Sequence, residues 1–116
     1  MKYLLPYFKV LCEEHRLSII ELLLEREYCV CELIEELSLS QSTVSYHVKE
    51  LREKGLIKCR YIKNSTFCSL DKEGFEKYTD YIQEKLFMPI AETSFTPSPM
   101  AVIKENSILL NNKACH

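Results

Sequence analysis

The chain has 116 residues but only two glycines, so it contains no Gly-rich loop of the kind that cradles phosphates. No base stands beside an evident nucleophile, which argues against an enzyme, including a thiol oxidoreductase. No apolar run approaches the roughly 18 residues that cross a membrane. The N-terminal MKYLLPYFKVL lacks the form of a signal peptide, and we find no internal repeat. We therefore expect a cytoplasmic protein that is not an enzyme.

The six cysteines include no CxxC pair, which argues against a zinc ribbon and against a thioredoxin-type redox site. In a cytoplasmic chain we expect thiols rather than disulfides. The length predicts one domain, and an apolar content of 47% is enough for a globular core. The cysteines are Cys12, Cys29, Cys31, Cys59, Cys68 and Cys115.

The segment SLSQSTVSYHVKELREKGLI, residues 38–57, has the pattern of a turn followed by an amphipathic helix. Ser40 can cap a helix over 41–54. Val44, Val48 and Leu51 recur at i, i+4 and i+7, the spacing of one apolar stripe.

The opposite face of this helix opens with short hydroxyls and adds an aromatic ring and cations. Hydroxyls bond phosphates or base edges, and lysine meets phosphate. An ordinary surface helix more often carries Glu/Lys pairs. Residues 41–63 have a charge of +4 while the rest of the chain carries −6, a basic patch on an acidic body. The candidate DNA-binding residues are Gln41, Ser42, Thr43, Ser45, Tyr46, His47, Lys49, Arg52, Arg60 and Lys63.

The flanking segments complete a DNA-binding unit. Residues 30–37 predict a short helix, so that a helix, a turn and a longer helix follow one another. Residues 57–70 contain β-branched and aromatic side chains on either side of a Lys63-Asn64-Ser65 turn. This pattern predicts a β-hairpin. We predict a mainly α-helical fold with a small β-hairpin, a winged helix-turn-helix.

These segments resemble the ArsR/SmtB family of winged-helix repressors over about residues 8 to 80. The resemblance rests on Phe8-Lys9-Val10-Leu11, His15-Arg16-Leu17, Ile20 to Leu24, Cys29-Val30-Cys31-Glu32-Leu33 and Ser40 to Leu51. It implies a homodimeric repressor that leaves a pseudo-palindromic double-stranded operator when an inducer binds.

Three further helices are expected, at about 3–11, 13–25 and 72–87. In the second, Leu17, Ile20, Leu23 and Leu24 should point inward. The first and the last carry more aromatic residues than a small core needs, namely Tyr3, Tyr7, Phe8, Phe75, Tyr78 and Tyr81. Such a surface is typical of an interface, and the family dimerises through these two helices. The alternative is that the rings cover a monomeric core.

Residues 1–87 are therefore expected to form the DNA-binding and dimerisation domain. Residues 88–116 are expected to be a Pro/Ser/Thr linker and a C-terminal tail. Within that tail, 101–110 regains apolar residues without a clear period, and either packs back on the dimer or pairs as a strand.

Cys29 and Cys31 match the family's metalloid-site helix and are the candidate metal ligands. Thiolates favour thiophilic ions such as arsenite or antimonite. On a regular helix residues i and i+2 point about 200° apart, so two sulfurs would chelate one ion only if the first turn unwound. The family pattern has a third cysteine where this chain has Ile34. Cys12 and Cys115 are the candidate replacements.

Other interpretations of the cysteines stay open. Cys29 and Cys31 are alternatively buried packing residues, or a redox or persulfide switch without a small ligand. Cys59 and Cys68 are expected on the two strands of the hairpin. We interpret them as packing residues, and the alternatives are a strained disulfide or a pair of ligands. The family's zinc site on its fifth helix is excluded because 71–87 contains no histidine. As an alternative function, the winged helix serves only as a protein-interaction module. We expect no organic cofactor.

Overall fold

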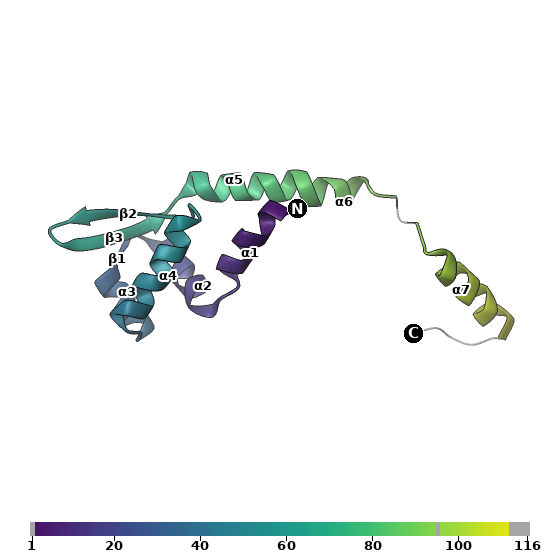
Figure 1. Cartoon of the computed structure of the whole chain (residues 1–116), viewed down its shortest axis with the longest axis horizontal. Helices are drawn as coiled ribbons and strands as arrows, with labels where there is room; N and C mark the ends of the chain where they lie inside the picture. The colour runs from purple at the N-terminus through teal and green to yellow at the C-terminus, as the bar shows by residue number, and fades with distance from the viewer. Residues whose placement is uncertain (1, 95, 112–116) are drawn as a thin grey trace.

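The computed structural model describes residues 2–94 and 96–111, with side chains placed up to residue 106, and it is mainly helical (Figure 1). The helical elements are η1 (Lys2–Leu4), α1 (Leu5–Leu11), α2 (Glu14–Glu25), α3 (Val30–Leu37), α4 (Gln41–Glu53), α5 (Lys72–Ile82), η2 (Gln83–Phe87), α6 (Met88–Glu92) and α7 (Pro99–Asn111), and the strands are β1 (Tyr28–Cys29), β2 (Ile57–Ile62) and β3 (Ser65–Leu70). The expected helices at 30–37 and 41–54 and the hairpin at 57–70 are confirmed. None of the described helices is long and apolar enough to cross a membrane.

The wing is a three-stranded antiparallel sheet in the order β1-β3-β2. β2 and β3 are joined by a two-residue turn in which Lys63 has φ 47° and Asn64 has φ 64°. Two positive φ angles match the twist of antiparallel strands, and asparagine tolerates this conformation well. The third strand was not expected: β1 pairs Tyr28 with Cys68 and Cys29 with Phe67. The sheet therefore ties the start of α3 to the wing.

α3 and α4 form the helix-turn-helix at the centre of the core. Leu33 of α3 and Val44 and Leu51 of α4 are completely buried, and Val48 is nearly so, which confirms the predicted stripe. Ser38 ends α3 with φ 54°, a left-handed residue that reverses the chain. This reversal places α4 across α3 with its other face toward solvent.

α2 buries a different pair of side chains from the expected set. Ile19 and Leu23 lie in the core, whereas Leu17 is 46% and Leu24 is 70% exposed. Apolar residues occupy several sides of this helix, so their number alone did not identify the inward side. The expectation was wrong for Leu17 and Leu24, and these two leucines remain on the surface of the single chain.

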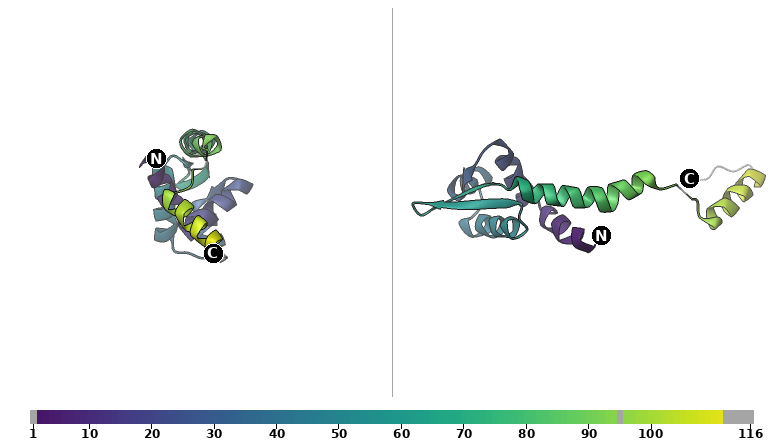
Figure 2. Two further views of the ribbon diagram at one scale, coloured as in Figure 1. Left: turned by 90° about the vertical axis from the view of Figure 1, so that its right-hand side faces the viewer. Right: turned by 90° about the horizontal axis from the view of Figure 1, so that it is seen from above.

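The helix that begins at α5 continues through η2 and α6 as one rod, which runs away from the core in the direction opposite to the wing (Figures 1 and 2). The expected linker at 88 therefore begins later, after Glu92. Pro89 lies in the first turn of α6, and because it lacks an N–H it removes one helical hydrogen bond just after the π-helical η2. The tail segment 99–111 is helix α7, not a strand.

α1 docks against α5 through aromatic rings. Tyr7 stacks on Tyr78 with ring centroids 4.7 Å apart, and Phe8 meets Tyr78 edge-on at 5.9 Å. Tyr3 meets Tyr81 at 6.2 Å. Some of these aromatic side chains thus hold the N-terminal helices against α5 within the single chain. Tyr3 nevertheless remains 73% and Phe8 45% exposed.

Candidate functional site

The first turn of α4 is organised by a cluster of hydroxyl groups. The Oγ of Ser40 accepts a hydrogen bond from the backbone N–H of Thr43 at 3.2 Å. The same hydroxyl donates to Thr43 Oγ1 at 2.8 Å and lies 3.2 Å from the Oγ of Ser42. Ser40 is thus the predicted cap, and it also fixes the positions of two candidate DNA-reading hydroxyls.

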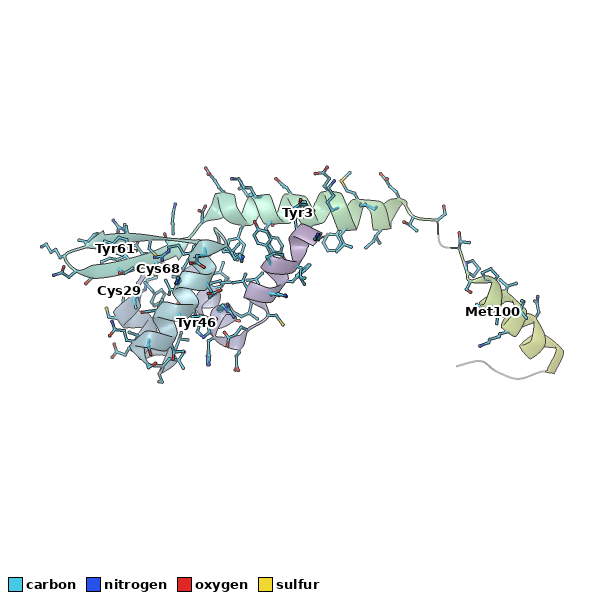
Figure 3. All side chains as sticks on the ribbon, in the orientation of Figure 1. Tyr3, Cys29, Tyr46, Tyr61, Cys68 and Met100 are labelled. Carbon is cyan, nitrogen blue, oxygen red and sulfur yellow. The ribbon has the colours of Figure 1, made fainter. Side chains whose placement is uncertain are left out.

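The exposed face of α4 carries most of the side chains predicted to contact DNA. All are exposed to solvent except Thr43, which is half-buried. Tyr46 is 54% exposed, and Figure 3 shows it on α4. Lys49 lies 4.0 Å from the carboxylate of Glu53 one turn later, a weak surface pair that leaves the ammonium free to meet a phosphate. This outward set is Gln41, Ser42, Thr43, Ser45, Tyr46 and Lys49.

His47 is the exception, and its assignment to the DNA-binding face was wrong. Its side chain is 6% exposed and lies on the core side of α4. Nδ1 lies 3.7 Å from a carboxylate oxygen of Glu13, and the ring is 5.7 Å from that of His15. Burial is the main cause that lowers the pKa of His47, although Glu13 opposes the shift. His47 therefore joins α4 to the start of α2.

The other predicted cations, near the end of α4 and on the wing, are exposed to solvent, and the two arginines among them form hydrogen bonds. Arg52 donates a hydrogen bond to the hydroxyl of Tyr61 at 3.1 Å, which links α4 to the wing. The guanidinium of Arg60 donates two hydrogen bonds, of 2.9 and 2.7 Å, to the carboxylate of Glu27. These bonds are the main cause that lowers the pKa of Glu27. Lys63 is exposed at the wing turn. Glu27 was not singled out from the sequence, since 33 positions separate it from its partner.

Cys29 and Cys31 lie together at the start of α3. Cys29 is the N-cap in an extended conformation, with φ −71° and ψ 148°, so it stands outside the helix. Its backbone N–H donates to Glu32 Oε1 at 3.0 Å, half of a capping box with Glu32. A hydrogen bond with the Cys29 side chain is the main cause that raises the pKa of Cys31. Because Cys29 precedes the helix, the angle of about 200° between residues i and i+2 of a regular helix does not describe this pair.

The two thiols open into the groove that also receives the DNA-facing side chains. This groove has a volume of about 510 Å³ and lies between α3, α4 and the wing. Cys29, which is buried, and Tyr61 of the wing both line it, and Figure 3 labels both. Tyr61 and Asn64 were not predicted as site residues. The strand period offered a signal for Tyr61, since it lies two residues after Cys59 on the same face. The groove residues from α4 are Gln41, Ser45, Val48, Lys49 and Arg52.

A third sulfur for this site is not found in the described part of the chain. Within residues 2–94 and 96–111, no group of three or more His, Cys, Asp or Glu side chains could hold a metal ion. Cys12 is exposed at the end of α1 and does not complete a site with Cys29 and Cys31. Cys115 lies outside the described residues.

Comparison with known proteins shows the family. A model described as "Bacterial regulatory protein, arsR family" matches residues 13–58. An arsenical resistance operon repressor of Staphylococcus xylosus is 36% identical over 85 residues, which span 73% of this chain and 78% of that protein. Its counterpart in Escherichia coli strain K12 is 48% identical over 60 residues, 49% of this chain and 51% of that protein.

Solved structures agree with this assignment. Reduced HlyU from Vibrio cholerae N16961 superimposes with a TM-score of 0.57 at 31% identity, covering 71% of this chain and 87% of that one. The predicted winged helix-turn-helix fold is confirmed. The chain therefore belongs to the ArsR family of bacterial regulatory proteins and is a DNA-binding transcriptional regulator, not an enzyme.

Proposed function

We propose that this regulator is a cytoplasmic, homodimeric repressor that binds a pseudo-palindromic operator and leaves it when an arsenite-like ion binds Cys29 and Cys31. The observation that carries the proposal is the shared groove: the two thiols and the DNA-facing side chains of α4 line one cavity. An ion bound there would act at the DNA-reading surface itself.

The DNA half of the proposal rests on the face of α4 and on the wing. A helix with exposed hydroxyls at its start fits the major groove, because its first residues meet base edges there. Tyr61 and Arg52 bond to each other between α4 and the wing, so the two elements present one continuous surface. Arg60 and Lys63 extend its positive charge along the wing toward the phosphates.

The sensing half rests on the chemistry and position of the two cysteines. Both cysteines line the groove, and Cys31 is exposed to solvent. Arsenite is As(OH)₃ near neutral pH, so each thiol that binds it replaces one hydroxide, which leaves as water with the thiol proton. Binding would pull on Cys29, which caps α3 and pairs with Phe67 of the wing. The start of α3 and the wing, which both pack beside the proposed DNA-binding surface, would then move together.

Two thiols supply two of the three sulfurs that trivalent arsenic takes. The relatives named as arsenical resistance operon repressors favour an arsenite-type inducer for this chain. Antimonite has the same preference for sulfur. Cys115 remains the candidate for the third position.

The dimer would form through α1 and the rod of α5, η2 and α6. The rod carries exposed apolar side chains beyond its contact with α1, and the N-terminal helices present Tyr3 from η1 and Phe8 from α1. Two copies related by a twofold axis would place their α4 helices in successive major grooves, with half-sites about 10 bp apart. The exposed apolar residues of the rod are Phe87, Met88 and Ile90.

A titration of a fluorescent DNA duplex from the chain's own promoter tests both halves. We expect salt-dependent binding that arsenite weakens at least about tenfold, which corresponds to a coupling of roughly 1.4 kcal/mol. Absence of binding would refute the DNA half and would favour a protein-contact module. Binding that ignores arsenite and antimonite would refute only the sensing half.

The double variant Cys29→Ser/Cys31→Ser locates the sensing site. It should bind the operator like the unmodified chain and lose the response to arsenite. Cys12→Ser is the matched control, because Cys12 is exposed and does not line the groove. It should respond normally; if it loses the response instead, the inducer site is at the end of α1. Sedimentation of Tyr3→Lys, which should shift toward monomer, tests the dimer surface.

A further inference from the structure

Cys59 and Cys68 form a second thiol pair, inside the wing. They are directly opposite each other in the register of β2 and β3, and their sulfurs lie 3.7 Å apart. Cys68 is completely buried and belongs to the core, whereas Cys59 is half-buried beside it. Both are free thiols. The proposed repressor function uses neither of them.

The register of the hairpin makes this position suitable for a covalent cross-link. The two-residue turn is flanked by the pair Ile62–Ser65, which exchanges backbone hydrogen bonds. Hydrogen-bonded and non-hydrogen-bonded pairs alternate along an antiparallel ladder, so Cys59–Cys68 is a non-hydrogen-bonded pair. Such pairs have Cα atoms about 4.5 Å apart, within the range that a disulfide spans. The strands therefore need little movement to accept one.

The surroundings of the pair favour a cross-link over a bound ion. Neither sulfur lines the groove between α3, α4 and the wing, and Cys68 is packed against core side chains. A ligand would have to open the core to reach both sulfurs. A disulfide adds no atoms and draws the two sulfurs together.

We propose that Cys59 and Cys68 are an oxidisable pair that forms a disulfide across the wing when the protein meets a hydroperoxide. The half-buried Cys59 reacts first: its thiolate attacks one peroxide oxygen, the O–O bond breaks, and a sulfenic acid forms. The sulfur of Cys68 then displaces hydroxide from this sulfenic acid, and water leaves. In total, two thiols and one hydrogen peroxide give one disulfide and two waters.

The order of these steps follows from the difference between the two thiols. Burial is the main cause that raises the pKa of Cys68 to about 12, and the neighbouring Cys59 adds to it. Cys68 therefore stays protonated and out of reach of peroxide until a sulfenic acid forms next to it. The cross-link would fix β2 and β3 in register and stiffen the wing. This inference does not depend on operator or arsenite binding.

Peptide mapping of the full chain tests the pair directly. The reduced protein is treated with stoichiometric hydrogen peroxide, its remaining thiols are alkylated in denaturant, and it is digested with trypsin. We expect two of the six thiols to be lost. Peptide 59–60 should be joined to peptide 64–72, at a mass two hydrogen atoms below their sum. Amide hydrogen exchange in β2 and β3 should slow about tenfold on oxidation.

Variants separate this pair from the thiols at α3. Cys29→Ser/Cys31→Ser should form the same cross-link, and Cys59→Ser should leave Cys68 fully alkylated. Six alkylated thiols in the oxidised chain, a sulfinic acid at Cys59 without a cross-link, or a disulfide to Cys31 would each overturn the proposal. Mapping of the unmodified chain decides the matter even if a variant fails to fold.

Discussion

Gly74, in the first turn of α5, lies against the backbone of Gly55, which follows α4. A Cβ atom built on Gly74 would come within 1.7 Å of the carbonyl oxygen of Gly55. The backbone N–H of Gly74 also donates to the capping carboxylate of Asp71 at 3.1 Å. The end of α4 and the start of the rod thus meet at a point where no side chain fits on Gly74.

We therefore expect Gly74→Ala to lower the free energy of unfolding by about 1–3 kcal/mol, because backbone must move to admit the methyl group. Urea denaturation measures the change. Gly55→Ala is the matched variant: its Cβ would meet nothing within 4 Å, and only its φ of 73° opposes the substitution. It should cost about 1 kcal/mol. If Gly74→Ala is as stable as the unmodified chain, the close approach described here is wrong.

Ser40→Ala should lower the free energy of unfolding by about 1 kcal/mol, because it leaves the N–H of Thr43 without its cap. Ser40→Asp should retain most of the stability, since aspartate caps equally well. Ser42→Ala should change stability by less than about 0.5 kcal/mol, as expected for a surface side chain outside the cap. Equal losses in Ser40→Ala and Ser42→Ala would contradict the cap.

Glu27→Gln should strengthen operator binding, because it frees the guanidinium of Arg60 from a carboxylate that now competes with phosphate. The slope of log K against log salt should become steeper by up to about one unit. Arg60→Gln should make it shallower. Glu53→Gln, which releases Lys49 from a longer and weaker contact, serves as the control and should change the slope less. An unchanged slope in both Glu27→Gln and Arg60→Gln would remove Arg60 from the interface.

Stability should fall as the pH is lowered through the ordinary histidine pKa of 6.5, because burial lowers the pKa of His47 in the folded chain. Between that lowered value and 6.5 the unfolded chain binds the extra proton and the folded chain does not, so protons favour unfolding. Urea midpoints measured from pH 5 to 7.5 should show this decline. His47→Gln should flatten it. An equally steep decline in His47→Gln would assign the effect to another group.

Periodic parts of the fold were predictable from the sequence. The stripe of Val44, Val48 and Leu51 identified the inward face of α4, and Lys63-Asn64 identified the wing turn. The buried His47 was also within reach of this reasoning, because it completes the i, i+3, i+4, i+7 pattern of that stripe. It was assigned to the DNA-binding face because it follows Tyr46 on the recognition helix, although its place in the stripe indicates burial.

Features without a period could not be predicted. A strand of two residues, such as β1, has no alternation, so only the structure shows that Cys29 pairs with Phe67. Pro89 signals a break in sequence, yet proline is tolerated in the first turn of a helix, and here the rod continues through it. The Arg60–Glu27 contact joins residues far apart in the chain, which no local pattern records.

The brevity of β1 has a thermodynamic consequence. It lies at the edge of the sheet and contributes two residue pairs to the ladder, whereas β2 and β3 share six. Detaching such a strand requires less free energy than unfolding the chain, although it exposes the buried side chains of Tyr28 and Cys29. Local openings of this kind occur in microseconds to seconds. If an inducer binds Cys29 as proposed, local fraying of β1 would let it exchange while the rest of the core and α4 stay folded.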